Sequence, residues 1–285
     1  MKSLKPITSF DLIVSCLVLI VGVGIAVPHA AAWPSKWGNY FENPLKSVHT
    51  RITEYAIEHS PRNYTTGYED ALIEGANMEL HELETSEAMR KMGFGYGVDV
   101  EAKRKEWGGT NEGCNHIEEI WNDAKGAYAE SLKAAESRDF KKGEELKKKA
   151  YFLVGIMLHM IEDMGVPAHA KKLIHQGNMT DFDNLEFMAL TNWEPQYDPF
   201  MDGVAQHDFK YDDPWRYYAL SERWTLSDVR AFPPGYNSIH TFSKTWALAT
   251  DAERDFFSKR QGRTCLITGW ALNDAITQFA WMKGR

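Results

Sequence analysis

The chain has 285 residues, of which 44% are hydrophobic and 25% charged, and its formal net charge at pH 7 is -8. These values are ordinary for a soluble globular protein and leave ample material for a buried core. The acidic balance argues against a nucleic-acid binder that relies on a basic surface, although bound metal ions could still give a nuclease local positive charge.

Residues 1–32 have the pattern of a secretory signal peptide. Two lysines near the start precede the apolar run Leu12–Val27, whose 16 residues are too few for an ordinary membrane span. Ala30–Ala32 offers a small-residue cleavage site. We therefore expect cleavage after residue 32, secretion or export to the periplasm, and a mature domain of residues 33–285. The alternative is a retained N-terminal anchor.

The first part of the expected mature chain predicts two helices. Apolar residues at helical spacing indicate a helix over 48–57, capped by Ser47 and carrying His49 in its first turn. A second apolar stripe predicts a helix over 68–92. Residues 93–113 are rich in glycine and charge, and we expect a loop there. This run lacks the GK[ST] ending of a phosphate-binding loop.

The remaining pattern is helical as well. An amphipathic stretch over 122–149 predicts a helix broken at residues 138–139, whose dense Lys and Glu indicate a solvated face, with a membrane-contacting basic patch as the alternative. The aromatic, proline-dotted stretch 192–236 predicts loops and short helices. Closing helices are expected over 238–257 and 264–282. Because no strand-like alternation or internal repeat occurs, the sequence predicts a single all-α domain.

The segment Leu153–Ala170, LVGIMLHMIEDMGVPAHA, contains the densest set of metal-ligand residue types. An apolar helix carries His159 and Asp163 at positions i and i+4, which places both side chains on one side of it. Glycine and proline then end the helix, and His169 follows in the expected loop. Two imidazoles and a carboxylate within eleven residues suit zinc. The alternative is a surface pair or a hydrogen-bonded core histidine.

The stretch LHMIEDMGVPAHA resembles the zinc-dependent phospholipase C family, whose pattern is a helical H-x3-D followed by a short P-x-H element. Fungal single-strand-specific zinc nucleases share this core. The resemblance extends loosely over residues 33–186 and is strongest over 153–169. It implies an all-helical domain that hydrolyses phosphodiesters at two to three zinc ions, in a cleft where helix ends meet the N-terminal arm.

The resemblance also implies a set of ligands. Trp33, freed by signal removal, would bind one zinc ion together with His49. Asp163 would bridge this ion to a second one, and Asp163 and Glu79 are the implied catalytic carboxylates. The second ion would also be held by Glu79, His116 and His159. A third would be held by His169 and Glu186, with Asp183 or His175 as a further partner.

The preferred function is therefore an exported phospholipase C that releases diacylglycerol and a phosphorylated head group. Its expected partner is a phospholipid or another phosphodiester, with peripheral membrane contact and without a stable nucleic-acid partner. Two alternatives are a single-strand-specific zinc nuclease and an exported metal-binding protein without turnover.

Overall fold

The computed structural model describes residues 47–60, 62–77, 110–171, 184–196, 213–232, 238, 241–243 and 245–284. Within these ranges the regular structure is helical and no strand occurs, which confirms the predicted all-α class. No helix in these ranges is both long and apolar enough to cross a membrane.

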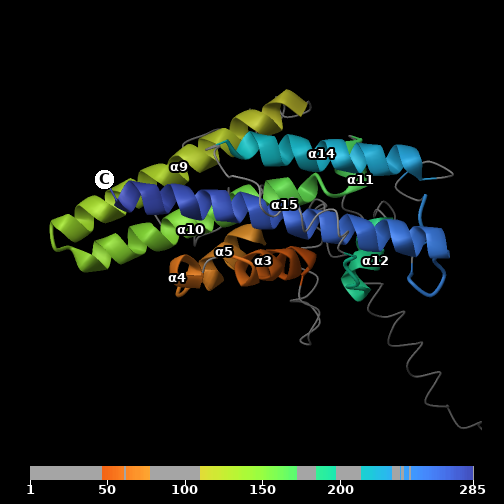
Figure 1. Cartoon of the computed structure of the whole chain (residues 1–285), viewed down its shortest axis with the longest axis horizontal. Helices are drawn as coiled ribbons and strands as arrows, with labels where there is room; N and C mark the ends of the chain where they lie inside the picture. Colours follow the sequence, from red (N-terminus) through yellow and green to blue (C-terminus); the bar gives the residue numbers. More distant parts are fainter. Residues whose placement is uncertain are drawn as a thin grey trace, which may run out of the picture.

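Long helices lie side by side along the length of the molecule (Figure 1). The helices are α3 (Val48–Glu58), α4 (Arg62–Thr65), α5 (Glu69–Ala76), α9 (Thr110–Glu136), α10 (Phe140–Asp163), α11 (Pro167–Ala170), α12 (Asn184–Thr191), α14 (Pro214–Ala231) and α15 (Asp251–Lys283). Helices α9 and α10 form a hairpin, α15 packs against α3, α10 and α14, and α5 packs across α10.

Helix α10 is the centre of the domain. Every residue from Ala150 to Glu162 is buried, as expected for a helix that is apolar on all sides. The helix begins where the sequence predicts a break: Arg138 has the left-handed φ of 61°, and the side chain of Asp139 accepts a hydrogen bond from the Lys142 backbone N–H at 3.2 Å. This turn folds α9 back onto α10.

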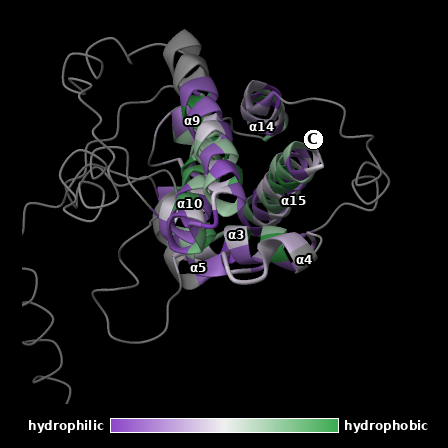
Figure 2. Ribbon diagram, turned by 90° about the vertical axis from the view of Figure 1, so that its left-hand side faces the viewer, coloured by the Kyte–Doolittle hydropathy of each residue, from purple (hydrophilic) through white to green (hydrophobic). Residues whose placement is uncertain are grey.

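The core has two parts, which meet near the end of α10. In the first part, Phe279 of α15 stacks on Tyr128 of α9 with ring centroids 4.2 Å apart. In the second part, Phe232, Phe242 and Phe256 pack together. Figure 2 shows α14 nearly end-on and α9 running obliquely toward α10, with apolar stretches on α10 and α15. Helix α3 contributes to both parts, and this fixes its first turn beside the end of α10.

Helices α5 and α10 cross at two glycines. A Cβ atom at Gly75 would lie 2.1 Å from the Phe152 carbonyl oxygen, and one at Gly155 would lie 2.2 Å from the Leu72 carbonyl oxygen. No other residue type fits this backbone-to-backbone contact without displacing a helix. The crossing brings the last carbonyl groups of α5 to the side of α10 that carries His159.

Two helix boundaries differ from the prediction in the first half. Helix α5 ends at Ala76, within the stretch 68–92 that the pattern predicted to be mostly helical, and residues 78–92 lie outside the described residues. It ends because the Asn77 side-chain amide donates to the Ile73 carbonyl and to the Thr50 hydroxyl, each at 2.8 Å. Helix α9 begins at Thr110, inside the predicted loop. A single glycine costs only about 1 kcal/mol inside a helix, so Gly113 does not mark a boundary.

The C-terminal half is more regular than predicted. The stretch expected to hold loops and short helices contains the 18-residue α14, which begins with Pro214, because proline at the first position suits a helix start. The two closing helices are one 33-residue helix, α15, which starts at a capping box of Thr250 and Glu253. Gly262 lies inside it because the backbone of Gln196 occupies the space of a side chain.

Candidate metal centre

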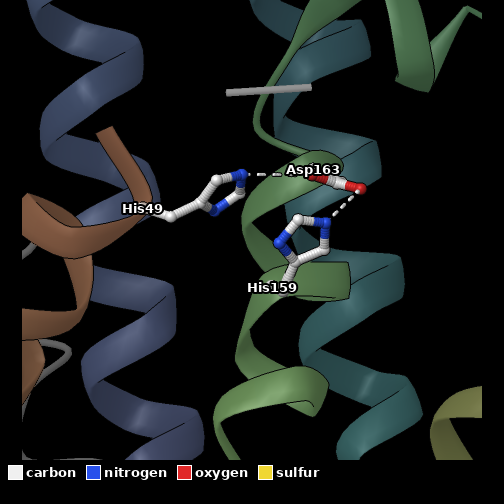
Figure 3. A group of neighbouring side chains, drawn as sticks. All are labelled: His49, His159 and Asp163. Atoms are coloured by element: carbon white, nitrogen blue, oxygen red, sulfur yellow. Dashed lines mark ion pairs between the residues drawn. The ribbon is translucent and has the colours of Figure 1, made fainter. Parts of the chain in front are cut away.

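Two histidines from different helices converge on one carboxylate (Figure 3). His49 comes from the first turn of α3, and His159 and Asp163 come from the last turns of α10. The His49 Nε2 atom lies 3.6 Å from Asp163 Oδ1, and the His159 Nε2 atom lies 3.4 Å from Asp163 Oδ2. One ligand atom of each residue falls within 4.8 Å of the others. This trio is the candidate metal centre.

The backbone of α5 orients His159. The Nδ1 atom of its ring lies 2.9 Å from the Ala76 carbonyl oxygen. Because a carbonyl only accepts hydrogen bonds, Nδ1 carries the proton, and in the neutral ring the Nε2 lone pair faces Asp163. Two atoms that both carry lone pairs then face each other, an arrangement that a cation or a proton between them would stabilise.

A buried carboxylate orients His49. The Nδ1 atom of its ring lies 2.5 Å from Oε2 of Glu162, and both side chains have 0% exposure. With Nδ1 engaged, Nε2 is the ring nitrogen that faces Asp163. The two imidazole rings stack with centroids 4.2 Å apart, so their Nε2 atoms lie at the same side of the trio.

Hydrogen bonds between α3 and α5 fix the two helix ends that serve the site. The Ser47 hydroxyl caps α3 by accepting from the Thr50 backbone N–H at 3.0 Å and also donates to the Asn77 side-chain carbonyl. Asn77 in turn donates to the Thr50 hydroxyl. His49 on α3 and the Ala76 carbonyl on α5 are therefore held at a fixed separation.

Each nitrogen-to-oxygen distance in the trio is compatible with a metal ion bound by both atoms. Zinc bonds of about 2.0–2.1 Å at tetrahedral angles place ligand atoms about 3.3 Å apart. The two nitrogen-to-oxygen distances, 3.4 and 3.6 Å, are close to this spacing. Both exceed the usual length of an N–H···O hydrogen bond, about 2.9–3.0 Å. Oδ1 of Asp163 has no hydrogen-bond partner, which fits a ligand atom.

Asp163 is the acidic centre of the trio. Burial would raise its pKa, but His159, His169 and His49 outweigh that effect and lower it to about 2, so Asp163 is a carboxylate at neutral pH. Its side chain keeps 16% exposure, whereas both histidines of the trio are buried.

His169, predicted to lie in a loop, stands in the short helix α11, because Pro167 restarts the helix two residues after Gly165. It is close enough to Asp163 to lower the pKa of that carboxyl group. It does not join the compact trio, whose ligand atoms lie within 4.8 Å of one another. A position beside the shared carboxylate suits a ligand of a neighbouring ion rather than of the same one.

The turn between Asp163 and His169 is fastened by α14 and α15. The Thr225 hydroxyl donates to the Met164 carbonyl at 2.7 Å, and Arg260 Nε donates to the Gly165 carbonyl at 3.2 Å. Arg260 is completely buried, and its Nη1 donates to Asp228 at 2.8 Å. The ion pair therefore links the turn that precedes His169 to α14 and α15.

The sequence interpretation missed Glu162, the carboxylate beside His49. Burial raises the pKa of Glu162 well above its usual value, against the opposing effects of His159 and of the Thr53 hydroxyl. A signal was present: Glu162 is the first charged residue after Lys149 in an apolar helix. A charge at such a position is buried, and a buried charge calls for a partner. Arg260 carried no comparable signal, because it stands among other basic residues.

The structure brings together only part of the predicted ligand set. Four further ligand candidates, namely Trp33, Glu79, Asp183 and His175, lie outside the described residues. His116 belongs to α9 and Glu186 to α12, but their side chains are not among those described.

Comparisons with models of protein families, with curated proteins and with solved structures gave no match to this chain. Support for a function therefore comes from the geometry of the trio and from the motif that carries it.

Proposed function

We propose that the chain is an exported zinc-dependent phosphodiesterase that acts on phospholipids in the manner of a phospholipase C. One observation carries the proposal: two Nε2 atoms face the two oxygens of Asp163 at 3.4 and 3.6 Å, and each nitrogen-oxygen pair has the spacing of two ligands on one zinc ion. Two imidazoles and a carboxylate favour zinc over magnesium or calcium, which prefer oxygen ligands.

When bound, zinc would supply positive charge and Lewis acidity toward a phosphodiester. The chain's own residues would bind and orient the ion. His49 and His159 offer neutral nitrogen ligands whose other ring nitrogens are already engaged. Asp163 offers two oxygens on opposite sides of its carboxylate, one toward each histidine, and can serve one ion or bridge two. His169 beside Asp163 would serve the further ion.

The phospholipid substrate is inferred from the resemblance of the H-x3-D and P-x-H elements to the phospholipase C family, and the net charge of -8 agrees with it. An acidic protein gains no general electrostatic affinity for nucleic acid. A nuclease and a metal-binding protein without turnover are outcomes that the experiment below distinguishes.

Export is part of the same proposal. Cleavage after residue 32 would give Trp33 a free α-amino group, which the resemblance assigns to one of the ions. N-terminal sequencing of the protein recovered from the periplasm or culture medium tests this, because a start other than Trp33 removes the terminal ligand.

The test compares the full-length protein, processed in the cell, with the variants His159→Ala, Asp163→Asn and His59→Ala. His59 is an exposed histidine at the end of α3 and serves as the matched control. Zinc content, hydrolysis of phosphatidylcholine vesicles and cleavage of single-stranded DNA are measured with and without a chelator. We expect zinc and chelator-sensitive phosphatidylcholine hydrolysis in the wild type and in His59→Ala, and neither in the other two variants.

Other outcomes overturn the proposal in part or whole. Chelator-sensitive cleavage of DNA alone would make the chain a nuclease. Bound zinc without hydrolysis of either substrate would make it a metal-binding protein without turnover. A wild-type protein that binds no zinc would remove the metal centre, and with it the whole proposal.

A further inference from the structure

We infer that Glu162 is a positioning residue that sets the affinity of the metal centre through His49, an inference that rests on the proposed zinc function. Glu162 does not face the ion position, which is the space between Asp163 and the Nε2 atoms of His49 and His159. Its carboxylate points toward α3, whereas Asp163, the next residue of α10, faces the ion position. The side chains of successive helix residues point about 100° apart. Asp163 can therefore bind the ion directly, while Glu162 supports it indirectly through His49 from the same turn.

Two side chains of α3 contact the carboxylate of Glu162. Its Oε2 lies 2.5 Å from His49 Nδ1, and its Oε1 accepts from the Thr53 hydroxyl at 3.2 Å. His49 and Thr53 are one helical turn apart, so both reach the same carboxylate from one face of α3. This double contact fixes the rotation of the carboxylate and therefore the direction of the imidazole.

The two ligand histidines differ in the group behind them. His159 donates to a neutral backbone carbonyl, whereas His49 is backed by a carboxylate. A negative charge on the Nδ1 side raises the electron density at Nε2 and strengthens its bond to a cation, and such supporting groups typically contribute 10- to 100-fold in metal affinity. His49 is therefore the more strongly donating of the two imidazoles.

The residue behind His49, at position 162, carries a carboxylate rather than a neutral amide. A glutamine would offer an acceptor of the same shape and avoid a buried charge, which is costly unless an opposite charge compensates it. Glu162 has 0% exposure and ends the buried stretch of α10 that begins at Ala150. A cation held by His49 and Asp163 would compensate a negative charge on Glu162, which is otherwise costly at this depth.

The experiment measures Zn²⁺ and Co²⁺ dissociation constants of the full-length protein and three variants by competition with a chromophoric chelator. Glu162→Gln keeps the shape and removes the charge, Thr53→Val keeps the charge and removes one of its anchors, and Glu145→Gln removes an exposed charge from the same helix. We expect 10- to 100-fold weaker binding in Glu162→Gln, a smaller loss in Thr53→Val, and an unchanged constant in Glu145→Gln. Visible spectra of bound Co²⁺ should change only in Glu162→Gln.

Nitrogen NMR of the wild-type zinc form keeps the inference testable even if Glu162→Gln does not fold. The inference requires the His49 proton on Nδ1 and the metal on Nε2, and the opposite arrangement would overturn it. Binding constants of Glu162→Gln and the wild type within twofold would also overturn it while leaving the zinc proposal intact. If the wild type binds neither ion, both proposals fail together.

Discussion

The crossing of α5 and α10 allows a prediction that links the fold to the metal centre. In Gly155→Ala, the new Cβ atom would lie 2.2 Å from the Leu72 carbonyl oxygen, and ordinary contact begins at 3.4 Å. The helices must therefore separate locally by about 3.4 − 2.2 = 1.2 Å. The same movement would lengthen the 2.9 Å contact between Ala76 and His159 to about 4.1 Å, beyond hydrogen-bonding distance.

The expected cost has two parts. Overpacking costs about 1–3 kcal/mol, and leaving the buried Nδ1 of His159 without an acceptor adds about 1–3 kcal/mol. Replacing glycine by alanine inside a helix returns about 1 kcal/mol. We therefore expect Gly155→Ala to lower the free energy of unfolding by about 1–5 kcal/mol and to weaken zinc binding, because His159 is then free to turn.

Gly126→Ala is the matched control. Gly126 is an exposed residue of α9, and an added Cβ would meet nothing within 4 Å. This variant should gain up to about 1 kcal/mol and keep the zinc affinity of the wild type. Urea unfolding at matched zinc concentration and zinc titration provide the two measurements. Equal stability of the two variants would refute the close crossing, and a destabilised Gly155→Ala with unchanged zinc affinity would refute its link to His159.

Three further predictions concern other contacts. Asp228→Asn removes the carboxylate that neutralises the buried Arg260 and should cost about 3–5 kcal/mol in urea unfolding, whereas a loss below about 1 kcal/mol would show that the ion pair does not fasten the turn after α10. Burial raises the pKa of Glu253, but hydrogen bonds from Thr250 and Ser243 outweigh this and lower it below 4.5, so its contribution to stability is present above about pH 4.5 and lost as the pH falls through the folded-state pKa. The stability difference between the wild type and Glu253→Gln, followed by urea unfolding, should therefore shrink on acidification, and a difference that grows would contradict the sign. Zinc at 100 times its dissociation constant should stabilise the wild type by about 2.7 kcal/mol and leave His159→Ala unchanged in thermal unfolding, whereas equal stabilisation of both would place the ion elsewhere.

Features that depend on neighbouring residues in the sequence could be predicted. The Ser47 cap, the break at residues 138–139 and the end of the ligand helix before Pro167 all follow from local backbone and hydrogen-bond preferences. The spacing of His159 and Asp163 on one face of a helix is local in the same sense, and the structure places both in the trio.

Features that depend on contacts between distant residues could not be predicted from the sequence. Helix α5 stops at Ala76 because Asn77 bonds to residues of α3, and Gly262 stays helical because the backbone of Gln196 packs against it. Neither partner can be read from its own stretch of sequence. The burial of Glu162 could be inferred from its own stretch of sequence, but its partner His49, which lies 113 positions away in the chain, could not.

The groups that support the trio come from four helices other than α10. Helix α5 supplies the Ala76 carbonyl, α3 supplies His49 and Thr53, and α14 and α15 fasten the turn that leads to His169. A metal ion bound by this trio would require the assembled domain, because His49 and the pair His159 and Asp163 come from different helices. An ion that binds it therefore adds its binding free energy to the packing of the whole helical domain.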